Sequence, residues 1–369
     1  MKCNKKLEFT EISQRITSLR FLLIIFVVFI HNNYTMETVA EYEATGRTLL
    51  FVQNEFGRWV QLLFSNGLAR CAVPLLFLFS GYFQGLKKEN YTVTLKKKCK
   101  SLLVPYMFWI VVYGFYYTFG KPLIIHFAPS LVGNHEDIFL SWTAKDWFFK
   151  IFGYGTKDGF PGFAYHFWFM RDLIILVLLS PILKLLVRKI PLGFFFFVGT
   201  WYLLAPKIIG ISNQALFFYV CGLYWGQYKL PMLEYVDKMS WKESITLFLG
   251  TFFICYGMSS RNVTLYWLMV MTACILLLKI SQVICSDERI YEVAANLSGY
   301  SFFLYAVHTP VLNEVLKKIW LRFFPMVNTF FSLFEYFGVT ILTVVIGTTL
   351  GFFVKKILPR FYSIITGDR

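Results

Sequence analysis

An arginine and a histidine mark the two ends of the first apolar segment of the chain. Arg20 and His31 belong to the stretch RITSLRFLLIIFVVFIHNN, residues 15–33. Eleven residues of α-helix make about three turns and advance about 16 Å, so the two side chains share one helix face. A charge within a membrane-spanning helix is costly unless it faces protein or water. The pair therefore predicts a site with a cation at one end and a base at the other.

The remainder of the chain has the composition of a membrane protein with many spans. Of its 369 residues 57% are hydrophobic and 15% are charged, and the apolar residues occur in runs of about twenty. We predict an all-α bundle of about ten transmembrane helices with both termini cytoplasmic, forming one membrane-embedded domain over residues 1–369. The spans are expected near residues 16–32, 66–86, 101–119, 167–187, 192–206, 211–229, 243–259, 263–281, 298–316 and 330–354.

The net charge of +15 is distributed unevenly across this topology. The inner segments carry twice as many Lys and Arg residues as the outer ones, which is the positive-inside bias. The basic residues therefore orient the chain and contact anionic lipid headgroups, and they give no reason to expect nucleic acid as a partner. The same bias predicts residues 87–100 in the cytosol and residues 120–166 outside.

The unusual polar residues fall into two layers. The inner layer holds Arg20 and the lysines Lys96, Lys97, Lys98 and Lys100, and the outer layer holds His31, Arg70, His166, Arg171, Asp172 and Glu314. His308 is expected between the layers, near the middle of the span 298–316. This division suits a reaction with an anionic cytosolic donor and an outer acceptor. No Cys or His spacing predicts a metal site.

Each candidate also has a purely structural interpretation. Extension to the inner headgroups would explain Arg20, and an interfacial position would explain His31 and His166. Ion pairing between helices would explain Arg70 and residues 171–172, and a hydrogen bond across helices would explain His308. Membrane anchoring alone would explain the lysine run. These alternatives stay open on the sequence.

Five segments in order resemble the acyltransferase 3 family of bacterial integral membrane acyltransferases. They are Arg20 with His31, VPLLFLFSGYF at 73–83, KKKCKSLLVPYMFW at 96–109, HFWFMRDLIILVLLSP at 166–181 and SGYSFFLYAVHTPVL at 298–312. One departure is that Lys97 and Lys100 stand where many members have an Arg-x-x-Arg pair. A lysine supplies charge but lacks the planar fork with which arginine grips a phosphate.

The resemblance implies an O-acyltransferase of the bacterial cytoplasmic membrane. Such an enzyme moves an acyl group, commonly acetyl, from cytosolic acyl-CoA to a hydroxyl of an envelope polysaccharide or lipid-linked sugar. Arg20, Lys97 and Lys100 would hold the phosphates of CoA, and His31 would act as base or accept the acyl group itself. Acyl-CoA is a co-substrate, and no permanently bound cofactor is expected. The acceptor-side candidates are Arg70, His166, Trp168, Arg171, Asp172 and His308.

Two other classes of function are compatible with the residues. A transporter of a lipid-linked glycan or acyl-sugar would use His, Arg and Asp as a proton relay, although the sequence shows no paired broken helices in corresponding halves. A structural membrane scaffold would leave the intramembrane charges without a purpose. Acyl-CoA consumption separates the enzyme from both.

Overall fold

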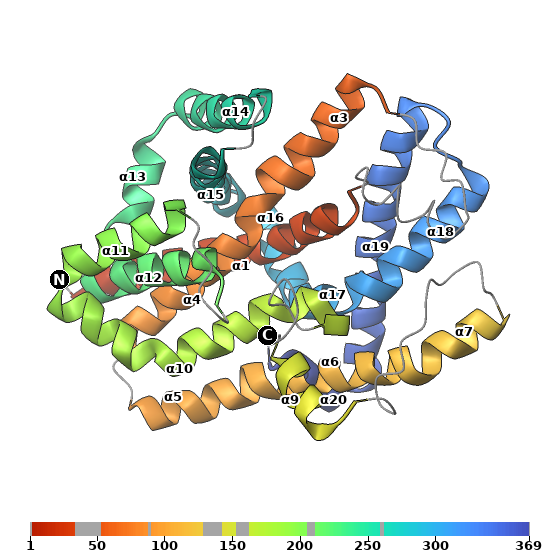
Figure 1. Ribbon diagram of the computed structural model, residues 1–369. Coiled ribbons are helices and arrows are strands. Elements are labelled where there is room, and N and C mark those ends of the chain that lie inside the picture. Colours follow the sequence, from red (N-terminus) through yellow and green to blue (C-terminus); the bar gives the residue numbers. More distant parts are fainter. Residues whose placement is uncertain are drawn as a thin grey trace. The chain divides into compact units, whose positions relative to one another are not determined.

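The computed structural model describes residues 2–33, 53–87, 90–127, 142–152, 162–204, 211–258 and 262–368. Over these residues the regular elements are all helices and no strand occurs (Figure 1), in agreement with the all-α prediction. The chain divides into two compact units, each assembled from three separate stretches. Unit 1 comprises residues 1–26, 67–98 and 172–301, and unit 2 comprises residues 27–66, 99–171 and 302–369.

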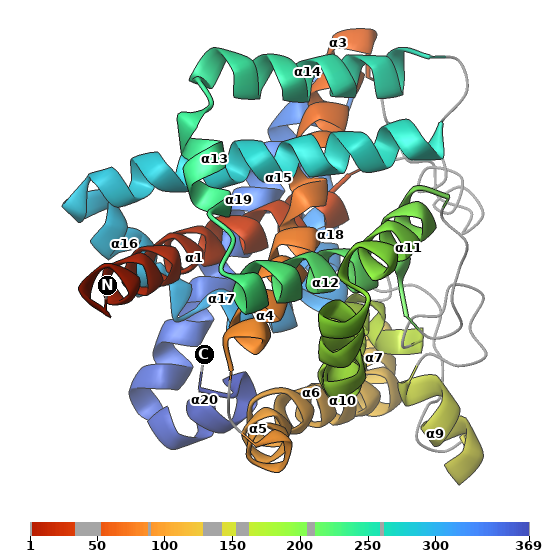
Figure 2. The same ribbon diagram turned by 90° about the vertical axis from the view of Figure 1, so that its left-hand side faces the viewer.

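Unit 1 contains the first part of α1 and most of α10, together with the helices of residues 67–98 and those that follow α10 up to residue 301. Polar caps fix several helix starts, including a capping box formed by Ser240 and Glu243. Figure 2 shows α14 lying alongside α15. The helices are α1 (Lys2–His31), η2 (Leu68–Cys71), α4 (Ala72–Leu86), α5 (Tyr91–Lys98), α10 (Trp168–Lys189), α11 (Pro191–Leu204), α12 (Asn213–Tyr228), α13 (Met232–Lys238), α14 (Trp241–Gly257), α15 (Val263–Ser286) and α16 (Glu288–Ser298).

Helices α4 and α12 of unit 1 are in backbone contact. Each carries a GxxxG pair, Gly81 with Gly85 on α4 and Gly222 with Gly226 on α12. A Cβ at Gly222 would lie 2.0 Å from the carbonyl oxygen of Leu78, and a Cβ at Gly226 would lie 2.2 Å from that of Tyr82. Only glycine allows this approach, and the four-residue spacing puts both glycines of a helix on the contact face.

A buried arginine connects the first half of α1 to other helices of unit 1. The Arg15 guanidinium donates to both carboxylate oxygens of Asp237 on α13, at 2.7 and 2.5 Å. The ammonium of Lys279 on α15 donates to the backbone carbonyl of Asp237 at 2.7 Å. Because Arg15 is 5% exposed, removal of Asp237 would leave this buried charge with the Glu11 carboxylate, at 2.9 Å, as its remaining ion pair. No spacing in the sequence indicates this group.

Unit 2 contains the end of α1 and the helices of the C-terminal part. Helix α18 packs along α19 (Figure 1), and α20 packs against α6 (Figure 2). The elements are α3 (Glu55–Gln61), η1 (Leu62–Gly67), η3 (Cys99–Leu103), α6 (Val104–Phe115), η4 (Tyr116–Gly120), α7 (Lys121–Phe127), α9 (Ala144–Ile151), η6 (Gly162–Phe167), α17 (Ser301–Val307), η7 (His308–Leu312), α18 (Asn313–Phe323), α19 (Thr329–Ile357) and α20 (Pro359–Thr366).

Five helical runs in the described residues are long and apolar enough to cross a membrane. They are Thr10–His31, Glu55–Leu86, Tyr91–Leu123, Val263–Ser286 and Thr329–Ile357. Each coincides with an expected span, and four more expected spans coincide with α10, α11, α12 and α14. The number of ten spans, the cytoplasmic termini and the single domain stay predictions.

The expected span over residues 298–316 is interrupted in the structure. Helix α16 ends at Ser298, α17 covers only Ser301–Val307, and Thr309 has the extended angles φ −141° and ψ 157°. Pro310 explains the break, because its ring disfavours the α conformation at the preceding residue and it has no N–H to donate. The chain resumes its helix at Asn313.

Candidate active site

His31 is the last residue of α1, where the backbone carbonyls of a helix lack partners. Its carbonyl oxygen accepts from the side-chain amide of Asn313 at 2.9 Å and from the ammonium of Lys317 at 3.3 Å. Burial lowers the pKa of Lys317, whereas the carboxylates of Glu335 and Glu314 raise it. Helix α18 therefore holds the backbone of His31, and the residue as a whole is half-buried.

The next residue fixes the same helix end to α19. The side-chain amide of Asn32, which is fully buried, donates to the carbonyl of Tyr336 at 2.7 Å and to the hydroxyl of Thr340 at 3.1 Å. One turn earlier, the hydroxyl of Ser65 donates to the carbonyl of Phe29 at 2.6 Å. The end of α1 is thus held by hydrogen bonds on both sides of His31.

Three histidines of unit 2 lie close together. The ring centroid of His308 is 5.2 Å from that of His31 and 5.6 Å from that of His166. Tyr165 packs edge-on against His31 at 5.5 Å, and its hydroxyl is 2.9 Å from that of Thr309. We call His31, His166 and His308 the histidine cluster. His308 therefore lies beside His31, and its depth in the membrane stays a prediction.

The helix break supplies the hydrogen-bond acceptors that orient this cluster. In a continuous helix the carbonyl of Ala306 would accept from the N–H of residue 310, and proline has none. The carbonyl is instead 3.3 Å from Nε2 of His166 and accepts from the hydroxyl of Tyr113 at 2.7 Å. The carbonyl of Tyr305 is 2.7 Å from Nδ1 of His308. One proline thus changes the partners around two histidines.

These contacts define which nitrogen of each ring carries the proton. A carbonyl oxygen only accepts, so Nδ1 of His308 and Nε2 of His166 are the protonated nitrogens. The opposite nitrogens, Nε2 of His308 and Nδ1 of His166, are buried and have no hydrogen-bond partner within the described part of the chain. In neutral rings both are acceptors. His308 and His166 are 0% and 2% exposed, so each holds a buried lone pair.

Two of the acceptor-side candidates have backbone partners that favour a structural role. The Arg171 guanidinium donates to the carbonyl of Phe152 at 3.3 Å, and the Asp172 carboxylate accepts from the backbone N–H of Ser212 at 2.9 Å. Ser212 is the N-cap of α12, so Asp172 helps to position the start of that helix. Trp168 begins α10 and is half-buried.

The cationic candidates are distributed over both units. Arg20, Arg70 and Lys97 belong to unit 1, and Lys100 belongs to unit 2. Lys100 is largely exposed and lies 3.8 Å from the Asp368 carboxylate. Arg20 is half-buried on α1, and continuity of α1 from Lys2 to His31 supports the spacing of about 16 Å between Arg20 and His31.

Several residues around the histidine cluster were not identified from the sequence. Tyr113, Tyr165, Asn313 and Lys317 lie far apart along the chain and carry no recognisable spacing. Pro310 was the available signal, because a proline within an expected span indicates an interrupted helix. Within the described residues no group of three or more His, Cys, Asp or Glu side chains has the arrangement of a metal site.

Comparison with known proteins decides the family. The acyltransferase domain model of the acyltransferase 3 family matches residues 14–352. The chain belongs to this family. It is also similar to the succinoglycan biosynthesis protein ExoH of Rhizobium meliloti (strain 1021), with 25% identity over 380 residues that cover 97% of this chain and 93% of that protein. No solved structure matches the chain.

The acyltransferase 3 match includes all three members of the histidine cluster. Together with the five apolar helical runs, it identifies the protein as a membrane acyltransferase.

Proposed function

We propose that this acyltransferase moves an acetyl group from cytosolic acetyl-CoA to a hydroxyl of a cell-envelope polysaccharide or lipid-linked sugar, on the outer side of the bacterial cytoplasmic membrane. The name of the relative ExoH supports a polysaccharide acceptor. The positive-inside bias supports a donor approaching the Arg20 end of α1 from the cytosol.

The histidine cluster is the observation that carries this proposal. His31 is the half-buried member and the most accessible of the three, and the ring of buried His308 is its neighbour at 5.2 Å. In our mechanism His31 removes the hydroxyl proton while the sugar oxygen attacks the thioester carbonyl. The C–S bond then breaks, and the thiolate leaves with the proton from the His31 imidazolium. One ester and one thiol form, so atoms and charge balance.

A covalent route uses the same residues. The acyl group would first pass to a ring nitrogen of His31 with release of the thiol, and then to the sugar hydroxyl. The lone pair on Nε2 of His308 would accept the hydroxyl proton in the second step. A burst of one CoA per protein in the absence of acceptor would favour this route, and no burst would favour direct transfer.

The donor is proposed to reach His31 along α1. Arg20, with Lys97 and Lys100, would bind the phosphates of CoA. The pantetheine arm would then extend over the separation of about 16 Å between Arg20 and His31. Arg70 would bind an anionic sugar group or the oxyanion, and His166 and Trp168 would contact the acceptor.

The test is acyl transfer by the purified protein in lipid nanodiscs. Wild-type protein with acetyl-CoA and envelope polysaccharide should release CoA, and mass spectrometry should find one added acetyl substituent per modified sugar. Membranes from cells with and without the protein should show the same difference in their glycans. Intact acetyl-CoA and unmodified glycan in both experiments would refute the proposal.

The side of action has its own test. Single cysteines at Ser130, which lies outside the described residues, and at Asn90 should label oppositely with a membrane-impermeant thiol reagent on intact cells, in a background without the seven native cysteines. We expect Ser130→Cys to react and Asn90→Cys to remain unlabelled. The reverse pattern would place His31 in the cytosol and contradict an outer acceptor.

The transport alternative receives one supporting observation, the helix break at Thr309. Discontinuous helices form substrate sites in many transporters. Transport would move a glycan across the membrane without consuming acetyl-CoA, so the CoA measurement above separates the two functions.

A further inference from the structure

Unit 1 contains a basic pocket that no role proposed above uses. The pocket has a volume of about 540 Å³, and its cationic lining residues are Lys87, Lys184, Arg188 and Lys229. Gln227 adds an uncharged amide. No acidic side chain lines the pocket among the residues that the structure describes. Four positive charges around one hollow therefore have no carboxylate partner in its wall.

Three helix ends form this pocket. Helix α4 ends at Leu86, α12 ends at Tyr228, and the last turns of α10 bring Lys184 and Arg188 against them. Gly85 and Gly226, the last glycines of the two GxxxG pairs, line the pocket. Their lack of side chains keeps the two helix ends close and the space between them open. All three ends belong to segments that the charge bias predicts on the cytosolic side.

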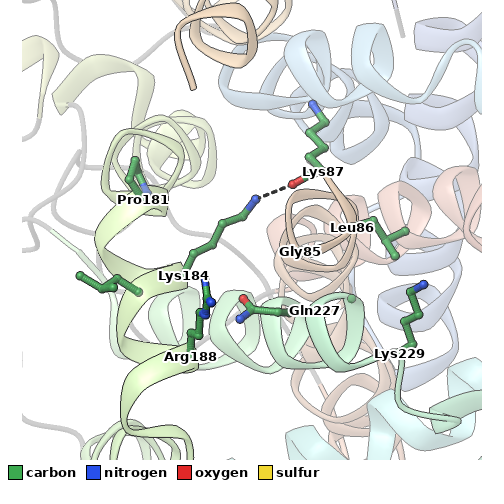
Figure 3. Close-up of a pocket in the computed structure, with 10 residues that line it drawn as sticks. Gly85, Leu86, Lys87, Pro181, Lys184, Arg188, Gln227 and Lys229 are labelled. Atoms are coloured by element: carbon green, nitrogen blue, oxygen red, sulfur yellow. Dashed lines mark hydrogen bonds between the residues drawn. The ribbon is translucent and has the colours of Figure 1, made fainter. Parts of the chain in front are cut away.

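One of the four cations has a structural partner. Figure 3 shows the Lys184 side chain crossing the pocket to the carbonyl of Lys87, at an Nζ to O distance of 3.0 Å. This contact satisfies a carbonyl at the end of α4, where a cation also complements the helix dipole. It does not neutralise the charge, and it holds the ammonium of Lys184 inside the pocket.

The other cations are free to bind a ligand. The side chains of Lys87, Arg188 and Lys229 have no ion pair within the described part of the chain. Figure 3 shows the Arg188 guanidinium and the Gln227 amide turned toward each other, with Lys229 beyond them at the end of α12. Arginine offers a planar fork for phosphate, and the lysines add point charges around it.

Anchoring to lipid headgroups is the simpler explanation for inner lysines, but it does not require a hollow. Anchoring needs only exposed cations at the membrane surface. Here the cations surround a volume within the range of about 300–1,000 Å³ that is typical of small-molecule sites. The accumulated charge suits a phosphate monoester, with about 1.5–2 negative charges at pH 7, better than the singly charged diester of a headgroup.

We propose that this basic pocket binds the ribose phosphate of the CoA donor, and that the diphosphate is left to Arg20, Lys97 and Lys100. The assignment rests on the proposed function, in which acyl-CoA is the donor. Arg188 and Lys229 contact the ribose phosphate directly, and Lys184 contributes charge from its position against α4. The site is an anchor for the nucleotide end of the donor and takes no part in the chemical step.

The test measures CoA binding by calorimetry with the full-length protein in nanodiscs of phosphatidylcholine alone. The variant Arg188→Gln with Lys229→Gln should bind CoA about 30-fold more weakly than wild type, since it removes two cations that contact phosphate and both of them are partly screened by solvent. The matched control, Lys238→Gln with Lys242→Gln, removes two exposed charges from the same predicted cytosolic connection outside the pocket. It should change the affinity less than about twofold.

A conservative variant guards against a folding artefact. Arg188→Lys keeps the charge and loses the fork, so it should fall between wild type and the double variant in CoA affinity. Wild type should prefer CoA over dephospho-CoA, and the preference should shrink in the double variant. Equal CoA affinity in wild type and the double variant would overturn the pocket assignment.

The lipid source is distinguished by adding phosphatidylglycerol to the nanodiscs. If the pocket binds lipid headgroups, phosphatidylglycerol should raise the thermal midpoint of unfolding of wild type but not that of the double variant, and the CoA affinity should not change. This result would overturn the proposal. If wild type transfers acetyl groups while the double variant keeps its CoA affinity, only the pocket assignment fails. If wild type neither binds CoA nor transfers, the proposed function fails as well.

Discussion

The histidine cluster and the basic pocket differ in almost every physical property. The cluster lies in unit 2, buries two of its three rings, and fixes them through backbone carbonyls and aromatic contacts. The pocket lies in unit 1 and gathers four cations without a described carboxylate. A dry environment strengthens hydrogen bonds and proton transfer, whereas an open cationic one attracts phosphate.

In our proposals the histidine cluster carries out the chemistry and the basic pocket recognises the donor. Changes in the cluster should lower turnover and leave CoA affinity intact. Changes in unit 1 should alter affinity or stability and leave the chemical step intact. The four changes below test this separation, in order of expected effect.

The variant His31→Ala should have the largest effect. Loss of the base should lower kcat by about 10²- to 10⁴-fold. CoA affinity and the thermal midpoint should stay near wild type, because the backbone contacts of His31 do not depend on its ring. Steady-state CoA release and calorimetry measure the two quantities. Wild-type transfer by this variant would remove His31 from the mechanism.

The second change separates the two nitrogens of His308. The amide nitrogen of Asn in His308→Asn can replace Nδ1 and keep the bond to the Tyr305 carbonyl, but no group replaces Nε2. We expect kcat to fall by about 10- to 100-fold with KM for acetyl-CoA unchanged. His308→Gln, whose longer side chain can place an oxygen near Nε2, should recover part of the activity.

The matched control for His308 is His126→Asn, which changes an exposed histidine on α7. This control should retain wild-type kcat. Equal kcat in His308→Asn and wild type would limit His308 to a packing role.

The third change acts on the GxxxG contact. Gly222→Ala should destabilise the protein by about 1–3 kcal/mol, because the added methyl group would overlap the Leu78 carbonyl. Gly250→Ala on α14 is the control, since nothing lies within 4 Å of its Cβ, and it should be neutral or slightly stabilising. Thermal unfolding in nanodiscs measures both. Equal midpoints of Gly222→Ala and wild type would show that α4 and α12 can move apart without loss of stability.

The smallest effect is expected from the lysine run. Lys97→Gln with Lys100→Gln should weaken CoA binding a few-fold, and the effect should diminish in high salt because both side chains are exposed. On the sequence alone, a double substitution of Lys87 and Lys88 would serve as the control for this variant. Lys87 lines the basic pocket, so Lys238→Gln with Lys242→Gln is the proper control. A loss larger than that of the pocket variant would make the lysine run the main phosphate site.

The sequence was informative where the relevant groups share one element. Arg20 and His31 lie on a single helix, so their spacing followed from helix geometry alone. Apolar runs predicted nine of the described helical segments, because bilayer thickness sets their length.

The sequence was uninformative where tertiary packing decides the neighbours. His31 and His308 are 277 positions apart, and their proximity depends on where the chain resumes after Pro310. The basic pocket depends on the approach of α4 to α12, which brings Lys87 and Lys229 to the same hollow. Lys184 was counted as part of an apolar span, and no local pattern indicated that its ammonium would reach α4.

The GxxxG contact also has a dynamic consequence. Helices that touch through side chains can slide or tilt when those side chains change rotamer. Helices α4 and α12 touch through their backbones, so no layer of side chains lies between them at this contact. We expect the two to move as one stiff pair. Occupation of the pocket should therefore reduce the fluctuations of its long cationic side chains, while the distance between the ends of α4 and α12 stays constant.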